Sequence, residues 1–197
     1  MCGIFGFVAK DGGYADRRIL RETAARASLR GPDGFGIAGR SGEQVHVSYG
    51  NGSLASSLFL VEDFLECDAI MGHCRLPTQG GREARHPFRS GDGWLMHNGN
   101  VKHPEKFKCQ TETNCDTELI AVRVGGLEVQ SAESIKKIAE EMHEGIPFAI
   151  GFLSQRNFAL IRDGHPIHVA ERKEGFYFSS RSFSASTMMS ESFERWR

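Results

Sequence analysis

The order of strand and helix segments along the chain predicts an α+β domain. Apart from one early helix, segments of strand type fill the first half of the sequence, two helical segments follow, and strand segments return in the last third. Most connections are short, which is typical of local pairing rather than of alternating βαβ units. The length of 197 residues fits one ordinary domain, so we expect a single domain over residues 1–197.

The first half predicts one buried strand, one helix and one hairpin. Cys2–Ala9 is short, apolar and rich in β-branched and aromatic residues, which favours a strand inside the fold. Asp16–Leu29 is predicted to be helical, and Gly31-Pro32 is a typical stop. Phe35–Gly39 and Gln44–Tyr49 flank a polar turn and are expected to pair as a hairpin. The apolar residues of the predicted helix recur at helical spacing: Ile19, Leu20, Ala24 and Ala27.

The second half predicts further strands around two helices. Asp68–Arg75 and Trp94–His97 are expected to be strands whose ends carry polar side chains, and such ends favour a functional site. Asp116–Val124 and Ser131–Glu144 are predicted to be helices, the second with Ser131 as its N-cap. The remaining expected strands, as antiparallel neighbours, are Pro147–Leu153, Asn157–Asp163, Pro166–Ala170 and Gly175–Ser180.

Composition argues against a nucleic-acid or membrane protein. The 24 Lys and Arg balance 25 Asp and Glu for a net charge of -1, so no broad basic surface favours phosphates or anionic lipids. The apolar run IFGFVA is far shorter than the roughly 20 residues of a membrane-spanning helix. Met1 leads directly to Cys2 without the basic start and apolar core of a secretory signal, so we expect a cytoplasmic protein.

The cysteines are expected to be thiols, and no metal or cofactor is predicted. Five cysteines are an odd number, without the density of a disulfide scaffold. None of their spacings gives the C-x-x-C pair of a structural zinc site, although His73 lies beside Cys74. No P-loop occurs, and the glycines of RGPDGFG do not follow the dinucleotide-binding pattern.

Cys2 is the most informative residue because it follows the initiator Met1. Removal of Met1 would leave a cysteine with a free α-amine, which titrates near neutrality and can act as a base toward its own thiol. One residue could then supply both nucleophile and base. The alternative is a small apolar cysteine at the start of a buried strand.

Four further polar clusters favour the catalytic interpretation. Together with CGIFG at the start, they form a set in this order along the chain: RGPDGFG (30–36), HCRLPTQG (73–80), HNGN (97–100) and NCDTE (114–118). With these motifs, the sequence resembles the glutaminase domain of the class II glutamine amidotransferases, which are N-terminal-nucleophile hydrolases. The resemblance covers the chain from Cys2 to about Ser180. It implies a four-layer αββα sandwich of two antiparallel sheets covered by helices.

The resemblance also implies roles for individual residues. Cys2 would attack the side-chain amide of L-glutamine and form a γ-glutamyl thioester, releasing ammonia and then glutamate. Asn98, through its side-chain amide, and Gly99, through its backbone N–H, match the two donors for the oxyanion. An Asn-Gly pair can otherwise be a plain tight turn.

Substrate recognition is expected to use opposite charges. Arg75, a planar guanidinium, with Thr78 as a further donor, matches the clamp for the α-carboxylate, and Asp116 matches the group that holds the α-ammonium. A surface ion pair for the arginine and an N-cap for the aspartate are the alternatives. Arg30 and Asp33 match an element near the nucleophile and are expected to support its backbone. In this resemblance His73 and His97 are structural, because the α-amine acts as the base.

The sequence departs from the sugar-phosphate transaminating members of the family in one loop. Residues 76–80 read LPTQG, closer to the phosphoribosylamine-forming type, and this short similarity does not identify an acceptor. We expect a separate synthetase or transferase subunit to accept the ammonia. The segment from about 181 to 197, rich in Ser with Met, Phe and Trp, is a possible tail that contacts this partner or is frayed.

Two rival functions remain open from the sequence. An N-terminal-cysteine hydrolase of another γ-glutamyl or unrelated amide would keep Cys2, but an unrelated amide would need neither Arg75 nor Asp116. A catalytically silent interaction module would keep the fold without a working site.

Overall fold

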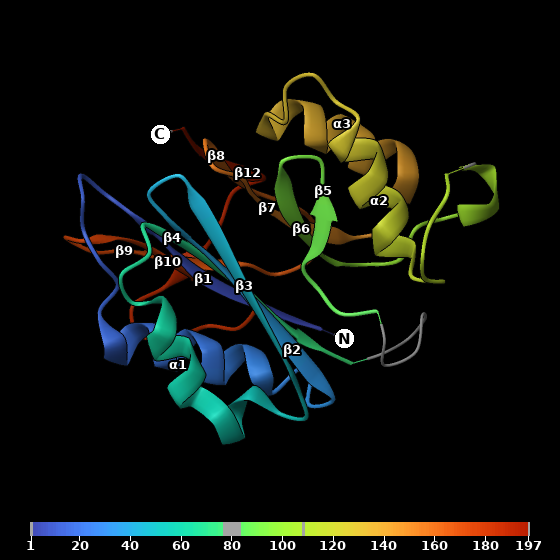
Figure 1. The fold of residues 1–197 in the computed structure, drawn as a ribbon. Coiled ribbons are helices and arrows are strands. Elements are labelled where there is room, and N and C mark those ends of the chain that lie inside the picture. Colours follow the sequence, from blue (N-terminus) through green and yellow to red (C-terminus); the bar gives the residue numbers. More distant parts are fainter. Residues whose placement is uncertain (1, 77–83, 108, 197) are drawn as a thin grey trace.

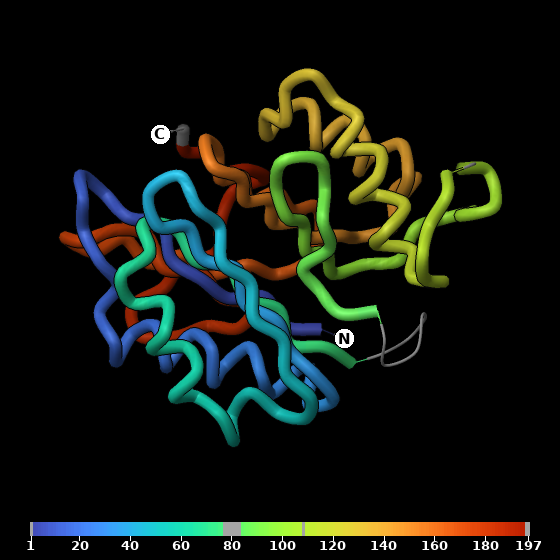
Figure 2. Tube along the Cα trace, viewed as in Figure 1, coloured from blue at the N-terminus to red at the C-terminus, as the bar shows by residue number. Residues whose placement is uncertain are grey.

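The computed structural model describes residues 2–76, 84–107 and 109–196, and it has four layers. Figure 1 shows two stacked sheets with helices on both outer faces, and the tube of Figure 2 follows the same path. Both sheets have antiparallel ladders throughout their named strands. The predicted α+β class and the αββα sandwich implied by the resemblance are therefore confirmed.

The larger sheet has seven strands in the order β11-β9-β10-β1-β4-β2-β3. Helix α1 (Arg17–Ser28) and the 3-10 segment η1 (Leu54–Phe64) pack on its outer face. Asp16 caps α1 by accepting from the backbone N–H groups of Arg18 and Ile19. The strands are β1 (Gly3–Ala9), β2 (Gly34–Ser41), β3 (Gln44–Asn51), β4 (Ala69–Arg75), β9 (His168–Glu171), β10 (Gly175–Ser179) and β11 (Thr187–Met188).

The smaller sheet has five strands in the order β12-β8-β7-β6-β5. Its outer face carries α2 (Asp116–Gly125) and α3 (Ala132–His143), and a short 3-10 turn, η2 (Pro104–Lys106), precedes α2. Ser131 caps α3 as predicted, by accepting from Ser134 N–H. The strands are β5 (Phe88–Ser90), β6 (Gly93–Asn98), β7 (Phe148–Leu153), β8 (Asn157–Asp163) and β12 (Ser192–Trp196).

Three apolar clusters separate the layers, and β1 contributes to two of them. Phe5 and Phe7 point toward α1, whereas Ile4 and Val8 lie in the cluster between the two sheets. All seven residues of β1 are buried, which explains why its sequence is continuously apolar instead of alternating. The third cluster lies between the smaller sheet and helices α2 and α3. In the described part of the chain, no helix is long and apolar enough to cross a bilayer.

The expected pairing of neighbouring strands in the last third is only partly correct. β7 pairs with β8, and β9 pairs with β10, both antiparallel. β8 and β9 do not pair, because the chain passes from the smaller to the larger sheet between them. The turn residues Gly164 and Pro166 mark the break, but they do not reveal that the chain changes sheets.

The C-terminal segment is not a frayed tail in the structure. β12 pairs with β8 along the edge of the smaller sheet, with Phe193 opposite Leu160. The Phe193 ring lies 5.1 Å from that of Phe176. Residues 182–197 contain both β11 and β12, so the expectation of a frayed tail is wrong, and a contact of this segment with a partner stays a prediction.

Glu194 joins β12 to α3, and its loss is expected to destabilise the fold. One carboxylate oxygen accepts from Ala132 N–H at 2.7 Å and from Asn157 Nδ2 at 3.0 Å. Because Ala132 begins α3, Glu194→Ala removes both an N-terminal cap and a favourable helix-dipole contact, at a cost of about 1–2 kcal/mol. Urea unfolding measures the change. Glu191→Ala, which removes an exposed ion pair to Lys136, is the control, and an equal loss in both variants would contradict the assignment.

Candidate active site

Cys2 lies immediately before β1, beside the end of β4. Its Sγ is 3.4 Å from Leu76 N and 3.5 Å from Leu76 O, and the adjacent register pairs Gly3 with Cys74. Figure 2 shows this chain start close to the end of β4 and between the two halves of the sandwich. The thiol is thus held at the end of the central strand pair, where it is half-buried.

The environment of the thiol has opposing electrostatic effects. Burial raises the pKa of Cys2, while the Leu76 N–H and the charges of Arg75 and Arg30 act in the opposite direction. Burial has the largest effect, so the thiol is held mainly protonated at neutral pH. A nucleophilic Cys2 therefore needs a base at the moment of attack.

Asn98 ends β6, Gly99 follows it, and both approach Cys2 from the smaller sheet. Asn98 Nδ2 donates to the backbone oxygen of Cys2 at 3.0 Å. Gly99 has a φ of +148°, and a Cβ there would come within 2.6 Å of His97 Nε2. A side chain at position 99 would collide with this ring, so the tight Asn-Gly geometry requires glycine.

One cavity brings the predicted residues together. Its lining includes Cys2, Arg75, Asn98, Gly99 and Asp116, although these residues come from four separate parts of the sequence. The volume is about 180 Å³, several times the ~30 Å³ that one water molecule occupies in the liquid. The cavity has room for a small organic molecule, with a cation and an anion in its wall.

The two charged residues of the cavity wall are both buried. Arg75 is 5% and Asp116 is 8% exposed. Asp116 is the first residue of α2 and makes no side-chain cap; its Oδ2 instead accepts from Val101 N–H at 2.8 Å. The N-cap alternative is thus not what the structure shows, and the carboxylate both lines the cavity and holds the segment after Asn98-Gly99.

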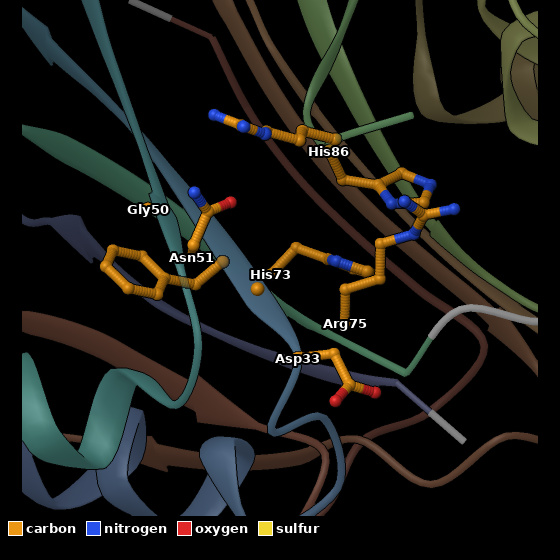
Figure 3. Close-up of a pocket in the computed structure, with 9 residues that line it drawn as sticks. Asp33, Gly50, Asn51, His73, Arg75 and His86 are labelled. Carbon is orange, nitrogen blue, oxygen red and sulfur yellow. The ribbon is translucent and has the colours of Figure 1, made fainter. Parts of the chain in front are cut away.

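A smaller pocket lies next to this cavity and shares Arg75 and His86 with it. Figure 3 shows the Arg75 side chain extending toward His86, with the Asp33 carboxylate pointing away from the guanidinium. His73, Asn51 and Gly50 complete the labelled part of the wall. Arg75 and His86 therefore lie between the two pockets.

The supporting residues act on the backbone around Cys2. Arg30 donates to Ser180 O at 3.1 Å, and Ser180 Oγ accepts from Ile4 N–H at 2.8 Å. Asp33 takes part through its backbone, because its N–H donates to Arg75 O at 3.0 Å. Thr78, predicted as a further donor to substrate, lies outside the described residues.

Known proteins were compared with the chain in sequence and in structure. No family model matches it. It is 29% identical over 147 residues to glutamine-fructose-6-phosphate aminotransferase of Bacillus subtilis, a match covering 67% of this chain and 24% of the relative. The Listeria monocytogenes enzyme of the same name is 29% identical over 169 residues, a match covering 80% of this chain and 27% of the relative. The chain is a homologue of class II glutamine amidotransferases. It spans about a quarter of the length of these curated relatives.

Solved structures of this family share the fold. The glutamine phosphoribosylpyrophosphate amidotransferase of B. subtilis matches with a TM-score of 0.74 and 22% identity, covering 96% of this chain and 45% of that chain. A glutamine aminotransferase class-II domain protein from Silicibacter pomeroyi gives a TM-score of 0.62 and 14% identity, with 99% of both chains covered. The sandwich is thus the N-terminal-nucleophile hydrolase fold of this homologous family.

Three histidines near the cavity, His73, His86 and His97, are buried and neutral, whereas His165, which also lines the cavity, is half-buried. Burial lowers the pKa of His73 to about 3 and holds the pKa values of His86 and His97 well below their usual range. None of these rings is suited to act as a general base near neutral pH. This agrees with the structural role that the resemblance implies for His73 and His97.

Several residues of this region could not be singled out from the sequence, among them His165 in the cavity wall and four others. His86 precedes β5, Thr117 is in the first turn of α2, His143 ends α3, and Leu76 contributes a backbone N–H. A backbone donor carries no signature in the sequence. The other three residues come together only because both sheets and both outer helices meet at this end of the sandwich.

The buried histidines predict a loss of stability in mild acid. In the unfolded chain these histidines bind protons below about pH 6.5. In the folded chain His73, His86 and His97 stay neutral until much lower pH. The free energy of unfolding thus decreases as pH falls from about 6.5 toward 3, by about 1.4 kcal/mol per pH unit for each group. Urea unfolding at pH 7.5, 6 and 5 measures the slope. A flat profile in the wild type would contradict the prediction.

Proposed function

We propose that the chain hydrolyses the side-chain amide of L-glutamine to glutamate and ammonia. The observation that carries this proposal is the shared cavity: a thiol, an Asn-Gly donor pair, a guanidinium and a carboxylate line the same small space. A free α-amino acid with an amide side chain presents the complementary groups, an α-carboxylate, an α-ammonium and an electrophilic carbonyl carbon.

The chemistry begins with maturation of the chain start. Removal of Met1 leaves Cys2 with a free α-amine, and this amine takes the thiol proton as sulfur attacks the amide carbon. The carbon–sulfur bond forms, the carbon–nitrogen bond breaks, and the proton passes to the leaving nitrogen, which departs as ammonia. Water then adds to the γ-glutamyl thioester, its proton returns to sulfur, and glutamate is released.

Asn98 and Gly99 serve the tetrahedral intermediates of both steps. Asn98 Nδ2 lies 3.0 Å from the Cys2 backbone oxygen and 3.5 Å from Ser180 Oγ. In the reaction one of its N–H groups, together with the Gly99 N–H, would donate to the oxygen of the attacked carbonyl. Donors held in place before the reaction stabilise an oxyanion without reorganisation. β6 holds Asn98 at its end, and the buried ring of His97, on the same strand, lies against Gly99.

Arg75 and Asp116 select the amino-acid end of the substrate. The guanidinium would bind the α-carboxylate bidentately, and Asp116 would use the oxygen that does not accept from Val101 to bind the α-ammonium. Both groups are buried, which strengthens charge pairing relative to the surface. A substrate that lacks either charge would lose one of these two charge-assisted contacts.

The ammonia is expected to serve an acceptor enzyme. The named relatives transfer glutamine nitrogen within chains about four times longer than the matched region, and for this protein we propose a separate synthetase or transferase subunit. Because the chemistry requires a reduced thiol, the cytoplasm suits it. Free glutamate and ammonia are the products when the acceptor is absent.

The test is release of both products from glutamine by the purified protein. Glutamate and ammonia should appear in equal amounts, whereas asparagine and simple carboxamides should react poorly. Efficient hydrolysis of an amide without an α-amino acid group would favour the rival hydrolase. No hydrolysis by protein that lacks Met1 would favour a silent module.

Arg75→Ala is expected to weaken glutamine use mainly through recognition. Hydrogen bonds to charged groups are worth about 1.5–3 kcal/mol, which corresponds to a loss in kcat/KM of roughly 10- to 200-fold, largely as increased KM. Steady-state kinetics with glutamine and with glutamine α-amide, which has no α-carboxylate, measure the contrast. The variant should lose its discrimination between these two substrates. An equal decrease in kcat/KM for both would show that Arg75 does not recognise the carboxylate.

A further inference from the structure

Beneath the Asn98-Gly99 turn lies a continuous row of buried hydrogen-bonding side chains. His86 Nε2 is 2.8 Å from Thr117 Oγ1, which is 3.0 Å from His97 Nδ1. His97 Nε2 is 2.9 Å from His143 Nε2, and His143 Nδ1 is 2.6 Å from the backbone oxygen of Ala139. The row thus runs from the segment before β5, through α2 and β6, to the last turn of α3.

The direction of every bond in this row follows from its last member. A carbonyl oxygen only accepts, so His143 must carry its proton on Nδ1. Burial lowers the pKa of His143, so the ring is neutral and its Nε2 accepts. His97 must then donate from Nε2, which leaves its Nδ1 as an acceptor.

The same logic continues to the other end. The His97 Nδ1 needs a donor, and the hydroxyl of Thr117 supplies it. Since its only proton is used, Thr117 accepts from His86 Nε2, and His86 Nδ1 carries no proton. His86 is thus the last member of the row at this end, and its Nδ1 is buried without a hydrogen-bond partner in the described part of the chain.

This row supports Gly99 directly. A Cβ on Gly99 would lie 2.6 Å from His97 Nε2 and 3.2 Å from His143 Nε2, so the Gly99 backbone rests on the bond between the two rings. His143 is held in turn by stacking on Phe148, with ring centroids 4.4 Å apart. The position of the proposed oxyanion donor therefore depends on the orientation of both rings.

We propose that Thr117 and His143 are positioning residues, which lock His86 and His97 into single tautomers through a one-way hydrogen-bond chain and thereby fix the Asn98-Gly99 turn. The inference rests on the proposed function for its effect on catalysis. The direction of the hydrogen bonds in this row does not depend on any activity. Thr117 also lines the cavity, whereas His143 lies behind it, and the proposal gives neither residue a contact with the reacting atoms.

Histidine ring ¹⁵N spectra of the protein at pH 7.5 directly test the proposed tautomers of the three rings. Single substitutions assign the signals. We expect three neutral rings, with the proton on Nε2 in His86 and His97 and on Nδ1 in His143. A proton on Nδ1 of His97, or a charged ring among the three, would overturn the proposal.

Thr117→Val tests the positioning role, since valine keeps the shape of threonine and cannot hydrogen-bond. We expect kcat for glutamine to fall roughly 10- to 100-fold, less than or comparable to loss of a whole oxyanion donor, with KM within about 3-fold. Thr117→Ser should restore kcat to within about 3-fold. Thr23→Val is the control, because Thr23 is an equally buried threonine whose hydroxyl donates to Leu20 O in α1, away from the cavity.

The backbone amide signal of Gly99 provides a readout that needs no turnover. It should shift in Thr117→Val and stay in place in Thr23→Val. An unchanged Gly99 signal in a folded Thr117→Val protein would overturn the positioning role, even where the tautomers are as expected. Absence of glutaminase activity in the wild type would count against the proposed function alone. The histidine ring spectra and the Gly99 amide signal would still test the hydrogen-bonded row and its effect on the turn.

Discussion

Replacing Cys2 by serine or alanine is expected to abolish glutamine hydrolysis. The thiol lies in the same cavity as the proposed oxyanion donors and the two charged groups, and loss of a nucleophile in an acyl-transfer site lowers kcat by on the order of 10⁴-fold or more. Ammonia release with saturating glutamine measures the effect. Because sulfur forms the thioester, the variants should also show no γ-glutamyl adduct by mass.

Cys109→Ser is the matched control for this experiment. Cys109 is a half-buried free thiol that does not line the cavity. It should retain wild-type activity. Substantial glutamine hydrolysis by the Cys2→Ala protein would mean that another group attacks the amide, and the proposed mechanism would be wrong.

Asn98→Ala is expected to produce the second largest loss. Removing one oxyanion donor costs about 10²–10³-fold in kcat, and KM should change little because the donor acts mainly on the tetrahedral state. Steady-state kinetics separate the two parameters. The variant also loses the bond to the Cys2 carbonyl, so a thermal melt is needed to show that the protein remains folded.

Asn51→Ala provides the comparison for the asparagine side chain. Asn51 is exposed at the end of β3 and lines the smaller neighbouring pocket instead of the main cavity. Its kcat and KM should match those of the wild type. A loss in Asn98→Ala that is confined to KM would assign the amide to ground-state binding instead of to the oxyanion.

Segments with a clear apolar period could be predicted from the sequence. β1, α1 and α3 appear where their patterns place them, and Ser131 caps α3 as predicted. Asp16, predicted to lie inside the first helix, is its N-cap. β12 was missed because its Ser-rich surroundings hide a short strand whose pairing depends on β8, more than 30 residues earlier in the sequence. η1 was missed because a 3-10 segment with a kink at Ser57 has no regular helical period.

The candidate site divides in the same way. The side chains that would meet substrate, such as Cys2, Arg75 and Asp116, could be named because their motifs are local. The groups that hold them could not be named. Leu76 contributes a backbone N–H, and the contact of Thr117 with His97 depends on how α2 packs on the smaller sheet.

The most direct test of the proposed function is the intact mass of the purified protein before and after treatment with a diazoketone analogue of glutamine. We expect Met1 to be absent and one adduct to form, located at Cys2 by peptide mapping. Excess glutamine should block labelling, and Arg75→Ala should slow it strongly. A protein without Met1 whose Cys2 stays unlabelled at high reagent concentration would contradict a glutamine site in this cavity.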